Sequence, residues 1–243
     1  MDKYESDTFG VLNAANYDQE HDPGTTAASV DCLAEFCQDA DAVLELAIGT
    51  GRVALPLAAR GIRIHGIDAS PAMLEVLHNK PGSDQLTTSI ADMADFDLPQ
   101  KFDFAYLIFN TLFNLKTQAA QVSCLQHVAR HLNPGGRFLI ETIVPDLSGF
   151  HDGQYVKTDE LSFDDLRIEA ATHDPISQRI ECQRVQFTQA GVTLKPFVYR
   201  YAWPAEIDLM AQLAGLRLEQ RWGDWQRGAF TGTSPMHVSL YRK

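Results

Sequence analysis

The chain has 243 residues, of which 45% are hydrophobic and 21% charged, and its formal net charge is −12. This length and composition predict a single globular domain rather than a disordered or fibrous chain. The negative charge argues against nucleic acids and membranes as partners, because nucleic acids and anionic membranes are bound through positive surfaces. The polar segment 1–8, the lack of an apolar run near the ~18 residues of a membrane helix, and four scattered cysteines predict a cytoplasmic protein with free thiols.

Up to residue 145, short apolar runs alternate with helical patterns. Residues 8–40 predict two helices, and a nearly continuous apolar run then marks the first buried strand. Ser70 is a suitable N-cap and Pro71 a suitable first residue for one of the helices. The expected strands cover 42–47, 62–67, 86–90, 102–109 and 137–143, the last after a turn at 133–136. The expected helices between them cover 53–60, 71–78 and 118–131.

The alternation stops after Pro145. Residues 154–202 show a period of two and a hairpin turn at 189–191, which predicts an inserted antiparallel sheet of three or four strands at 150–202. A helix at 204–214 and strands near 216–222 and 236–242 complete the chain. We therefore expect one α/β domain over residues 1–243, a doubly wound, mostly parallel, seven-stranded Rossmann-like sheet with this insertion. Exposed sheets also pair with each other, so a monomer and a homodimer both remain open.

A glycine turn joins the first strand to the first helix of the alternating region. Gly49 and Gly51 let the backbone turn sharply and let a ligand approach closely, at the edge of the sheet where open α/β folds bind ligands. Asp68 ends the second strand and could hold a ribose diol. These features alone fit a dinucleotide site as well, or a turn with a purely structural role.

Five sequence segments, taken in chain order, distinguish between these kinds of site. Glu45-x-Ala47-x-Gly49-x-Gly51 is followed by Gly66–Leu74 and by Ala91-Asp92-Met93. Phe102–Leu112 and Leu132–Gly136 come next. Over about residues 10–145 and the C-terminal strands, the chain resembles the class I S-adenosylmethionine-dependent methyltransferases, with Ala47 where that family usually has its first glycine.

This resemblance implies S-adenosyl-L-methionine as the cofactor and assigns roles to several residues. Asp68 would bind the ribose hydroxyls, Asp92 the adenine amino group, and Met93 would lie against the adenine ring. Tyr17 belongs to an N-terminal segment that resembles the one many small-molecule methyltransferases fold over the cofactor. The full set of expected cofactor-binding residues is Tyr17, Glu45, Ala47, Gly49, Gly51, Arg52, Asp68, Ala69, Ser70, Met73, Asp92, Met93, Phe109 and Asn110.

The catalytic and acceptor-binding residues carry weaker signals. Methyl transfer needs alignment and exclusion of water more than a fixed triad, and only a hydroxyl acceptor usually needs a positioned base. Tyr17 and His173 are the catalytic candidates; His151 and His237 could also face the acceptor. His127 and His131 lie four residues apart but lack a third ligand, so no metal is expected. Trp225, in a glycine-rich polar segment, is expected at the site entrance. The expected acceptor contacts are Tyr17, Phe113, Glu141, Tyr199 and Trp225.

The segment 205–216 indicates which kind of acceptor is methylated. With the position of the insertion, it resembles a subgroup that methylates amines, which includes deoxysugar, glycine, sarcosine and cypemycin peptide N-methyltransferases. A small-molecule or short-peptide amine is the expected acceptor, and an O-methyltransferase is the alternative within the family. A nicotinamide-dependent oxidoreductase would be expected to show a Tyr-x-x-x-Lys dyad, which is absent from the sequence. An inactive cofactor-binding subunit would be expected to lack the acidic anchors, which are present.

Overall fold

The central sheet has seven strands in the order β10-β11-β5-β4-β1-β2-β3. The computed structural model describes residues 1, 3–38 and 40–243. Strand β11 runs antiparallel to both its neighbours, and the other pairings are parallel. The predicted fold class is therefore confirmed. The strands are β1 (Val43–Leu46), β2 (Ile64–Asp68), β3 (Thr87–Ile90), β4 (Phe102–Leu107), β5 (Leu132–Ile143), β10 (Arg217–Trp222) and β11 (Met236–Arg242).

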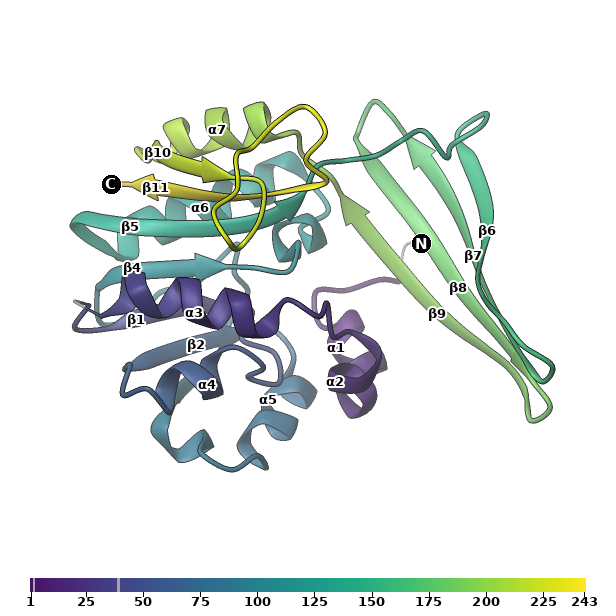
Figure 1. The fold of residues 1–243 in the computed structure, drawn as a ribbon, viewed down its shortest axis with the longest axis horizontal. Coiled ribbons are helices and arrows are strands. Elements are labelled where there is room, and N and C mark those ends of the chain that lie inside the picture. Colours follow the sequence, from purple (N-terminus) through teal and green to yellow (C-terminus); the bar gives the residue numbers. More distant parts are fainter. Residues whose placement is uncertain (2, 39) are drawn as a thin grey trace.

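Helices cover both faces of this sheet (Figure 1). Successive residues of a strand point to opposite faces, so Val43 packs in the core beneath α3 and α4, and Leu44 in the core beneath α6 and α7. Ser70 caps α5 by accepting from the Met73 N–H, as predicted. The helices are α1 (Thr8–Asn13), α2 (Tyr17–Glu20), α3 (Thr26–Cys37), α4 (Ala54–Ala58), α5 (Pro71–His78), α6 (Gln118–His131) and α7 (Pro204–Leu213), with short 3₁₀ turns at Ala14–Asn16, Ser83–Gln85 and Thr111–Asn114.

A second sheet of four antiparallel strands stands beside the carboxyl edge of the central sheet (Figure 1). Its strands are β6 (Gln154–Leu161), β7 (Asp165–Asp174), β8 (Arg179–Thr188) and β9 (Gly191–Arg200), in that order across the sheet. Ile180 and Cys182 are 2% exposed and belong to the same core as the central sheet. Phe163 and Leu161, at the far end, are 102% and 77% exposed. We call this four-stranded sheet the second sheet.

The structure differs from the predicted elements in two places. The first of the two helices expected in 8–40 is split into α1, a 3₁₀ turn and α2, because Asn13 and Asn16 leave helical backbone geometry. The turn expected at 133–136 lies within the bounds of β5, where a register shift against β4 and a positive φ at Gly135 accommodate it. Within the part of the chain that the structure describes, no helix is long and apolar enough to cross a membrane.

Candidate cofactor and acceptor site

The turn after β1 is shaped by three residues with left-handed backbone. Ala47, Gly49 and Gly51 have φ of 53°, 57° and 79°. A Cβ on Gly51 would lie 2.2 Å from Leu77 Cδ1, so any other residue would strain the backbone and displace the Leu77 side chain. Ala47 adopts a conformation that costs an L-residue ~1–2 kcal/mol. The turn therefore keeps the glycine-type geometry although one of its positions holds alanine.

Asp68, at the end of β2, fastens this turn. Its Oδ2 accepts the Gly49 N–H at 2.8 Å, and its Oδ1 accepts the Ser70 N–H at 2.8 Å. Burial raises the pKa of Asp68, and the two backbone donors lower it in part. The carboxylate faces a cavity, which we call the cofactor cavity. Of the residues expected to bind the cofactor, those that line it are Tyr17, Ala47, Gly49, Asp68, Ala69, Ser70, Asp92 and Met93.

Asp92 and Met93 form another wall of the cofactor cavity, after β3. Asp92 Oδ1 accepts the Ala94 N–H at 2.8 Å, which fixes the carboxylate in the turn. Met93 is 9% exposed and offers an apolar surface. Two carboxylates and an apolar side chain around one cavity suit a ligand with hydroxyls, an amino edge and a flat ring.

The N-terminal segment covers this cavity and is tied down at several points. Asp18 accepts hydrogen bonds from Thr50 Oγ1, at 2.6 Å, and from Lys80 Nζ. Lys80 Nζ also donates to the Thr50 carbonyl at 2.8 Å. On the opposite side, Glu20 forms an ion pair of 2.5 Å with Lys195 of β9. Helix α2 therefore joins the glycine turn to the second sheet.

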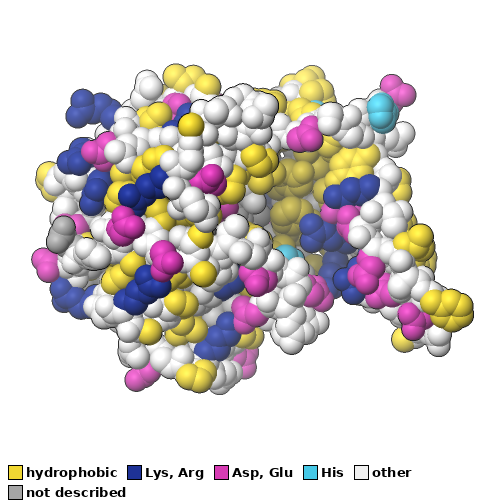
Figure 2. Space-filling model, in the orientation of Figure 1, with side chains coloured by type: hydrophobic (Ala, Val, Ile, Leu, Met, Phe, Trp, Pro, Cys, Tyr) yellow, Lys and Arg dark blue, Asp and Glu magenta, His cyan; other side chains and the backbone are white. Residues whose placement is uncertain are grey.

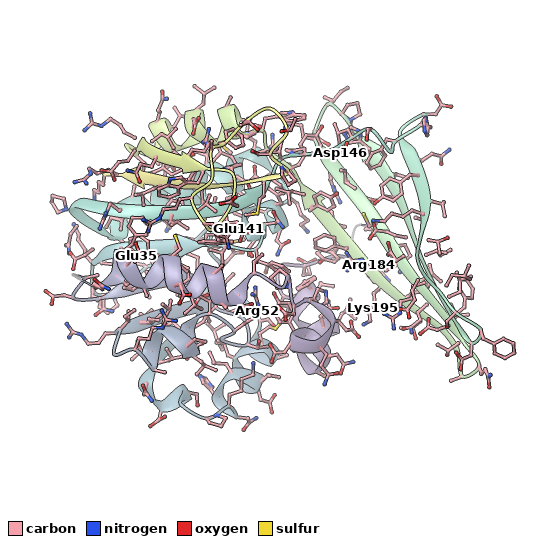
Figure 3. All side chains as sticks on the ribbon, viewed as in Figure 1. Glu35, Arg52, Glu141, Asp146, Arg184 and Lys195 are labelled. Carbon is pink, nitrogen blue, oxygen red and sulfur yellow. The ribbon has the colours of Figure 1, made fainter. Side chains whose placement is uncertain are left out.

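A strained bend follows β4 and lies between these parts. Phe109 and Asn110 both have φ of 60°, and such backbone strain clusters at functional sites. Glu141 Oε2 accepts the Phe109 N–H at 2.7 Å, and the Arg52 guanidinium carbon lies 4.9 Å from the centre of the Phe109 ring. Burial raises the pKa of Glu141, and the Phe109 N–H and the Arg52 charge lower it in part. Figure 3 shows Arg52 and Glu141 on the central-sheet side of the cleft.

Glu45, by contrast, lies beneath the site. Its side chain is buried and accepts a hydrogen bond of 2.8 Å from the Tyr106 hydroxyl. Burial raises the pKa of Glu45 to about 8, against the lowering effect of Tyr106 and Arg52. Met73, also expected to bind the cofactor, is 4% exposed and packs under Gly10. Neither side chain lines the cofactor cavity, so contact with the cofactor stays a prediction for both.

A second cavity of about 270 Å³ opens between the bend and the second sheet. Its walls include Phe113 and Tyr199, two of the expected acceptor contacts, and also Phe109 and Asn110. Tyr17 lines both this cavity and the cofactor cavity. We call this second cavity the acceptor cavity. A group placed in it lies beside the cofactor cavity, with the Tyr17 side chain at the boundary.

Comparison with known proteins identifies the family. Residues 43–136 match the family model described as a methyltransferase domain. The chain is 30% identical over 209 residues to the cypemycin N-terminal methyltransferase of Streptomyces sp, with 84% of each chain covered. It is 26% identical over 238 residues to the dTDP-3-amino-3,4,6-trideoxy-alpha-D-glucopyranose N,N-dimethyltransferase of Streptomyces venezuelae, with 94% of this chain and 98% of the relative covered. The solved structure of the CcbJ methyltransferase from Streptomyces caelestis aligns with a TM-score of 0.91 and 34% identity over 98% of this chain and 99% of that one.

The chain is an S-adenosylmethionine-dependent methyltransferase. Its cofactor cavity suits this donor, because Asp68 and Asp92 offer acceptors for hydroxyl and amino groups. Arg52, also expected to bind the cofactor, does not line this cavity; its Nη1 donates to Thr26 Oγ1 at 2.6 Å, and its buried Nε has no hydrogen-bond partner among the described residues. A guanidinium with a vacant donor fits a carboxylate such as that of the methionyl group.

Two predicted positions in the methyltransferase need correction. Trp225 lies on a loop, as expected, but it is only 4% exposed and packs in the core with Val30 and Leu33 instead of lying at the entrance. The polar flanks of the loop bind α3, where Arg227 forms an ion pair of 2.7 Å with Glu35. His237 is fully buried, with Thr142 and Ser239 hydroxyls at 2.8 and 2.7 Å from its ring nitrogens, so it does not face the acceptor cavity.

Three other histidines, His127, His131 and His173, make structural contacts. His173 Nε2 lies 3.1 Å from the Tyr201 hydroxyl at the base of the second sheet, and it does not line the acceptor cavity. A catalytic role for His173 stays a prediction without support from this position. His127 and His131 contact the backbone at Phe96 and Leu98. Within residues 1, 3–38 and 40–243, no group of three or more His, Cys, Asp or Glu could hold a metal.

Sequence reasoning missed several residues of the acceptor cavity. His21 stacks on Tyr17 with ring centroids 5.0 Å apart and an interplanar angle of 11°. Phe9 lies against His21, and Phe197 and Arg184 line the cavity from the second sheet. The spacing of Tyr17 and His21 over one helical turn could have suggested a shared face. Nothing in the sequence indicated which face of the second sheet turns toward the site.

Proposed function

We propose that the methyltransferase N-methylates a small amine-bearing molecule, or the terminal amine of a short peptide, in specialised metabolism. The observation that carries this proposal is the acceptor cavity itself, which adjoins the cofactor cavity at Tyr17 and contains a histidine with a lowered pKa. The volume of about 270 Å³ suits a small acceptor rather than a nucleic acid. The names of two relatives, a peptide N-terminal methyltransferase and an amino-sugar N,N-dimethyltransferase, point in the same direction.

S-Adenosylmethionine, when bound, supplies a methyl group on a positively charged sulfur. Asp68 would bind its ribose hydroxyls and Asp92 its adenine amino group, as the positions of both carboxylates in the cofactor cavity allow. Arg52 would bind the carboxylate. The hydrogen bonds that Asp18 accepts from Lys80 and Thr50 would hold the N-terminal segment over the cofactor. Alignment of this kind can supply ~7–11 kcal/mol of the barrier reduction.

The acceptor amine must lose a proton, because only a neutral amine has a lone pair to attack. His21 is placed to accept that proton in the acceptor cavity. Burial lowers its pKa, and the positive charge of Arg184 lowers it further, so the neutral imidazole predominates at neutral pH. Tyr17 keeps its proton, because burial raises its pKa more than the nearby Arg52 lowers it. Tyr17 would therefore orient the acceptor, and His21 would act as the base.

The walls of the acceptor cavity would also exclude water. Phe9, Phe113 and Phe197 give it apolar surfaces from three separate segments of the chain. A dry site favours the reaction, because the positive charge disperses as the methyl group moves and water solvates the starting charge better. We further propose that the second sheet, as a lid inserted over residues 150–202, selects the acceptor, and that the protein works in the cytoplasm.

A screen of matched acceptors tests this function. Each amine is paired with the alcohol of the same skeleton, and release of S-adenosylhomocysteine is measured by mass spectrometry with and without the acceptor. We expect turnover with members of the amine set and none with their alcohols. Turnover confined to alcohols would replace the proposal by its alternative, an O-methyltransferase, in which His21 would deprotonate a hydroxyl.

A further inference from the structure

A band of charged side chains crosses the face of the second sheet that looks toward the central sheet. Cross-strand partners point to the same face, and the register pairs Glu169 with Arg184 and Arg184 with Lys195. Arg167 lies two residues from Glu169 on β7 and shares this face. The same face is apolar nearer the central sheet, where Cys182 and Phe197 form a cross-strand pair. Polarity therefore changes along the strands, from apolar at the acceptor cavity to charged beyond it.

The charged band lines a cavity of its own, of about 420 Å³, which we call the outer cavity. The outer cavity and the acceptor cavity share the side chains of Phe9, His21, Arg184 and Phe197. The two cavities are therefore neighbours with common walls. An acceptor whose amine lies beside Tyr17 can extend past Arg184 into the outer cavity.

The charge of the outer cavity runs against the charge of the whole protein. Arg167, Arg184 and Lys195 line it, against two carboxylates, Glu20 and Asp159, so its lining carries a net charge of 3 − 2 = +1. The whole chain carries −12. Figure 2 shows Lys and Arg side chains inside the hollow between the two sheets. Positive charge concentrated in a hollow of an acidic protein attracts anions.

Arg184 is the residue best placed to use this charge. Its Nε donates to Glu169 Oε2 at 2.9 Å, which holds the guanidinium plane. Burial by itself raises the pKa of Glu169, but donors from Tyr155 and Arg184 and the charge of Lys157 lower it overall, so Glu169 is an ionised anchor. Neither Nη atom of Arg184 makes a hydrogen bond to any residue the structure describes, and the side chain remains 47% exposed. Two parallel N–H donors are the arrangement that binds a carboxylate or phosphate in a bidentate manner.

We infer that the acceptor carries an anionic group, a carboxylate or a phosphate, and that Arg184 binds this group at the junction of the two cavities, with Lys195 and Arg167 beside it. The inference rests on the proposed amine methylation and adds a second chemical group, an anion, to the acceptor. Figure 3 shows Arg184 and Lys195 on the second sheet, across the cleft from Arg52 and Glu141. The methyl donor and the anionic end of the acceptor then occupy opposite sides of the cleft.

An ion-pair network that only stabilises the second sheet is the rival explanation. Lys195 pairs with Glu20 at 2.5 Å, and Arg167 with Glu160 at 3.1 Å, so these two cations already have partners. A stabilising network predicts that substitution of Arg184 changes the melting temperature but no ligand affinity. An anion site predicts a change in affinity in a protein that remains folded.

Calorimetric titration distinguishes the two explanations without knowledge of the acceptor. The full chain, saturated with S-adenosylhomocysteine, is titrated at constant ionic strength with pyrophosphate and separately with glutarate. The variants are Arg184→Gln and Arg184→Lys, and Arg217→Gln, at an exposed position of β10, is the matched control. Lys195→Gln replaces Arg184→Gln if circular dichroism shows the latter unfolded.

We expect saturable binding by the wild type and by Arg217→Gln, at least tenfold weaker binding by Arg184→Gln, and a smaller loss in Arg184→Lys. If only pyrophosphate binds, the anionic group of the acceptor is a phosphate; if only glutarate binds, it is a carboxylate. Absence of saturable binding, or equal binding by Arg184→Gln in a folded protein, overturns the inference even if amines are methylated. Arg184-dependent binding in a protein that methylates no amine contradicts the proposed function and supports the anion site by itself.

Discussion

Tyr17 and His21 stack face to face, with ring centroids 5.0 Å apart and an interplanar angle of 11°. The two residues lie one helical turn apart, at the start of α2 and just after it. Asp18 and Glu20, between them, are tied to Lys80 on one side and to Lys195 of the second sheet on the other. The two rings are therefore held at the boundary of the cofactor and acceptor cavities by ion pairs in both directions.

The first prediction concerns the pH dependence that His21 gives to the reaction. Its pKa is lowered below 6.5, so the base is present above the lowered value and is lost as the pH falls through it. We expect the rate with an amine from the screen to fall on the acid side below pH 6.5. His21→Asn should remove this limb and lower kcat by about 10²-fold, the typical contribution of a general base.

Tyr17→Phe is the matched control for His21→Asn, because it keeps the aromatic stack and leaves His21 in place. We expect this variant to keep the acid limb and to change mainly KM. A pH–rate profile of His21→Asn that coincides with that of the wild type would show that the acceptor loses its proton by another route.

The second prediction compares the two carboxylates of the cofactor cavity. Asp68→Ala removes an ionised acceptor of two ribose hydrogen bonds, each worth ~1.5–3 kcal/mol, and also frees the Gly49 N–H. Asp92→Ala removes one contact to the adenine edge. By calorimetry with S-adenosylhomocysteine, we expect the affinity lost in Asp68→Ala to exceed that lost in Asp92→Ala by at least ~10-fold. Equal losses would mean that the ribose is bound elsewhere.

The third prediction tests the cover formed by the N-terminal segment. A Cβ on Gly10 would lie 2.2 Å from Ser70 Oγ and 3.1 Å from Met73 Cγ, so Gly10→Ala should displace α1 from α5. With an overpacking cost of ~1–3 kcal/mol, we expect S-adenosylmethionine to bind about tenfold more weakly. Gly149→Ala is the control, because a Cβ there meets no atom within 4 Å. If Gly10→Ala bound S-adenosylmethionine with unchanged affinity, the N-terminal segment would have no role in cofactor binding.

The fourth prediction concerns the strained alanine in the glycine turn. Ala47→Gly relieves a left-handed conformation that costs ~1–2 kcal/mol, against ~0.4–1 kcal/mol for the greater freedom of glycine in the unfolded chain. We expect a net gain in the free energy of unfolding of about 0.5–1 kcal/mol, seen as a higher Tm. Ala59→Gly, at φ −60°, should lower the Tm because it relieves no strain. A lower Tm for Ala47→Gly would show that its methyl group contributes packing.

Much of the cofactor cavity could be predicted from the sequence, because its residues follow strands in short, local turns. Asp68 is the last residue of β2 and Asp92 lies two residues after β3, and parallel strands bring such ends to one edge. The resemblance to the methyltransferase motifs predicts both residues at the cofactor site, and both line the cofactor cavity. The inserted sheet could likewise be predicted from the period of two in residues 179–187.

The acceptor side could not be predicted, because it depends on how separate elements dock. Alternation along β8 places Arg184 and Val185 on opposite faces of the sheet, but it does not indicate which of these two residues points toward the cleft. Trp225 was misplaced for the same reason, since polar flanks predicted exposure and Arg227 instead holds the loop onto α3 through Glu35. His21 follows a helix of only four residues, which is too short for a periodic signal.

The most direct test of the proposed reaction is to follow the methyl group to its new atom. The protein is incubated with S-adenosylmethionine labelled with ¹³C in the methyl group and with an acceptor that contains both an amine and a hydroxyl. The product is examined by heteronuclear NMR for the atom attached to the label. We predict that the labelled carbon is bonded to nitrogen and that Asp68→Ala yields little product. Label bonded to oxygen or carbon would contradict the assignment of this methyltransferase to amines.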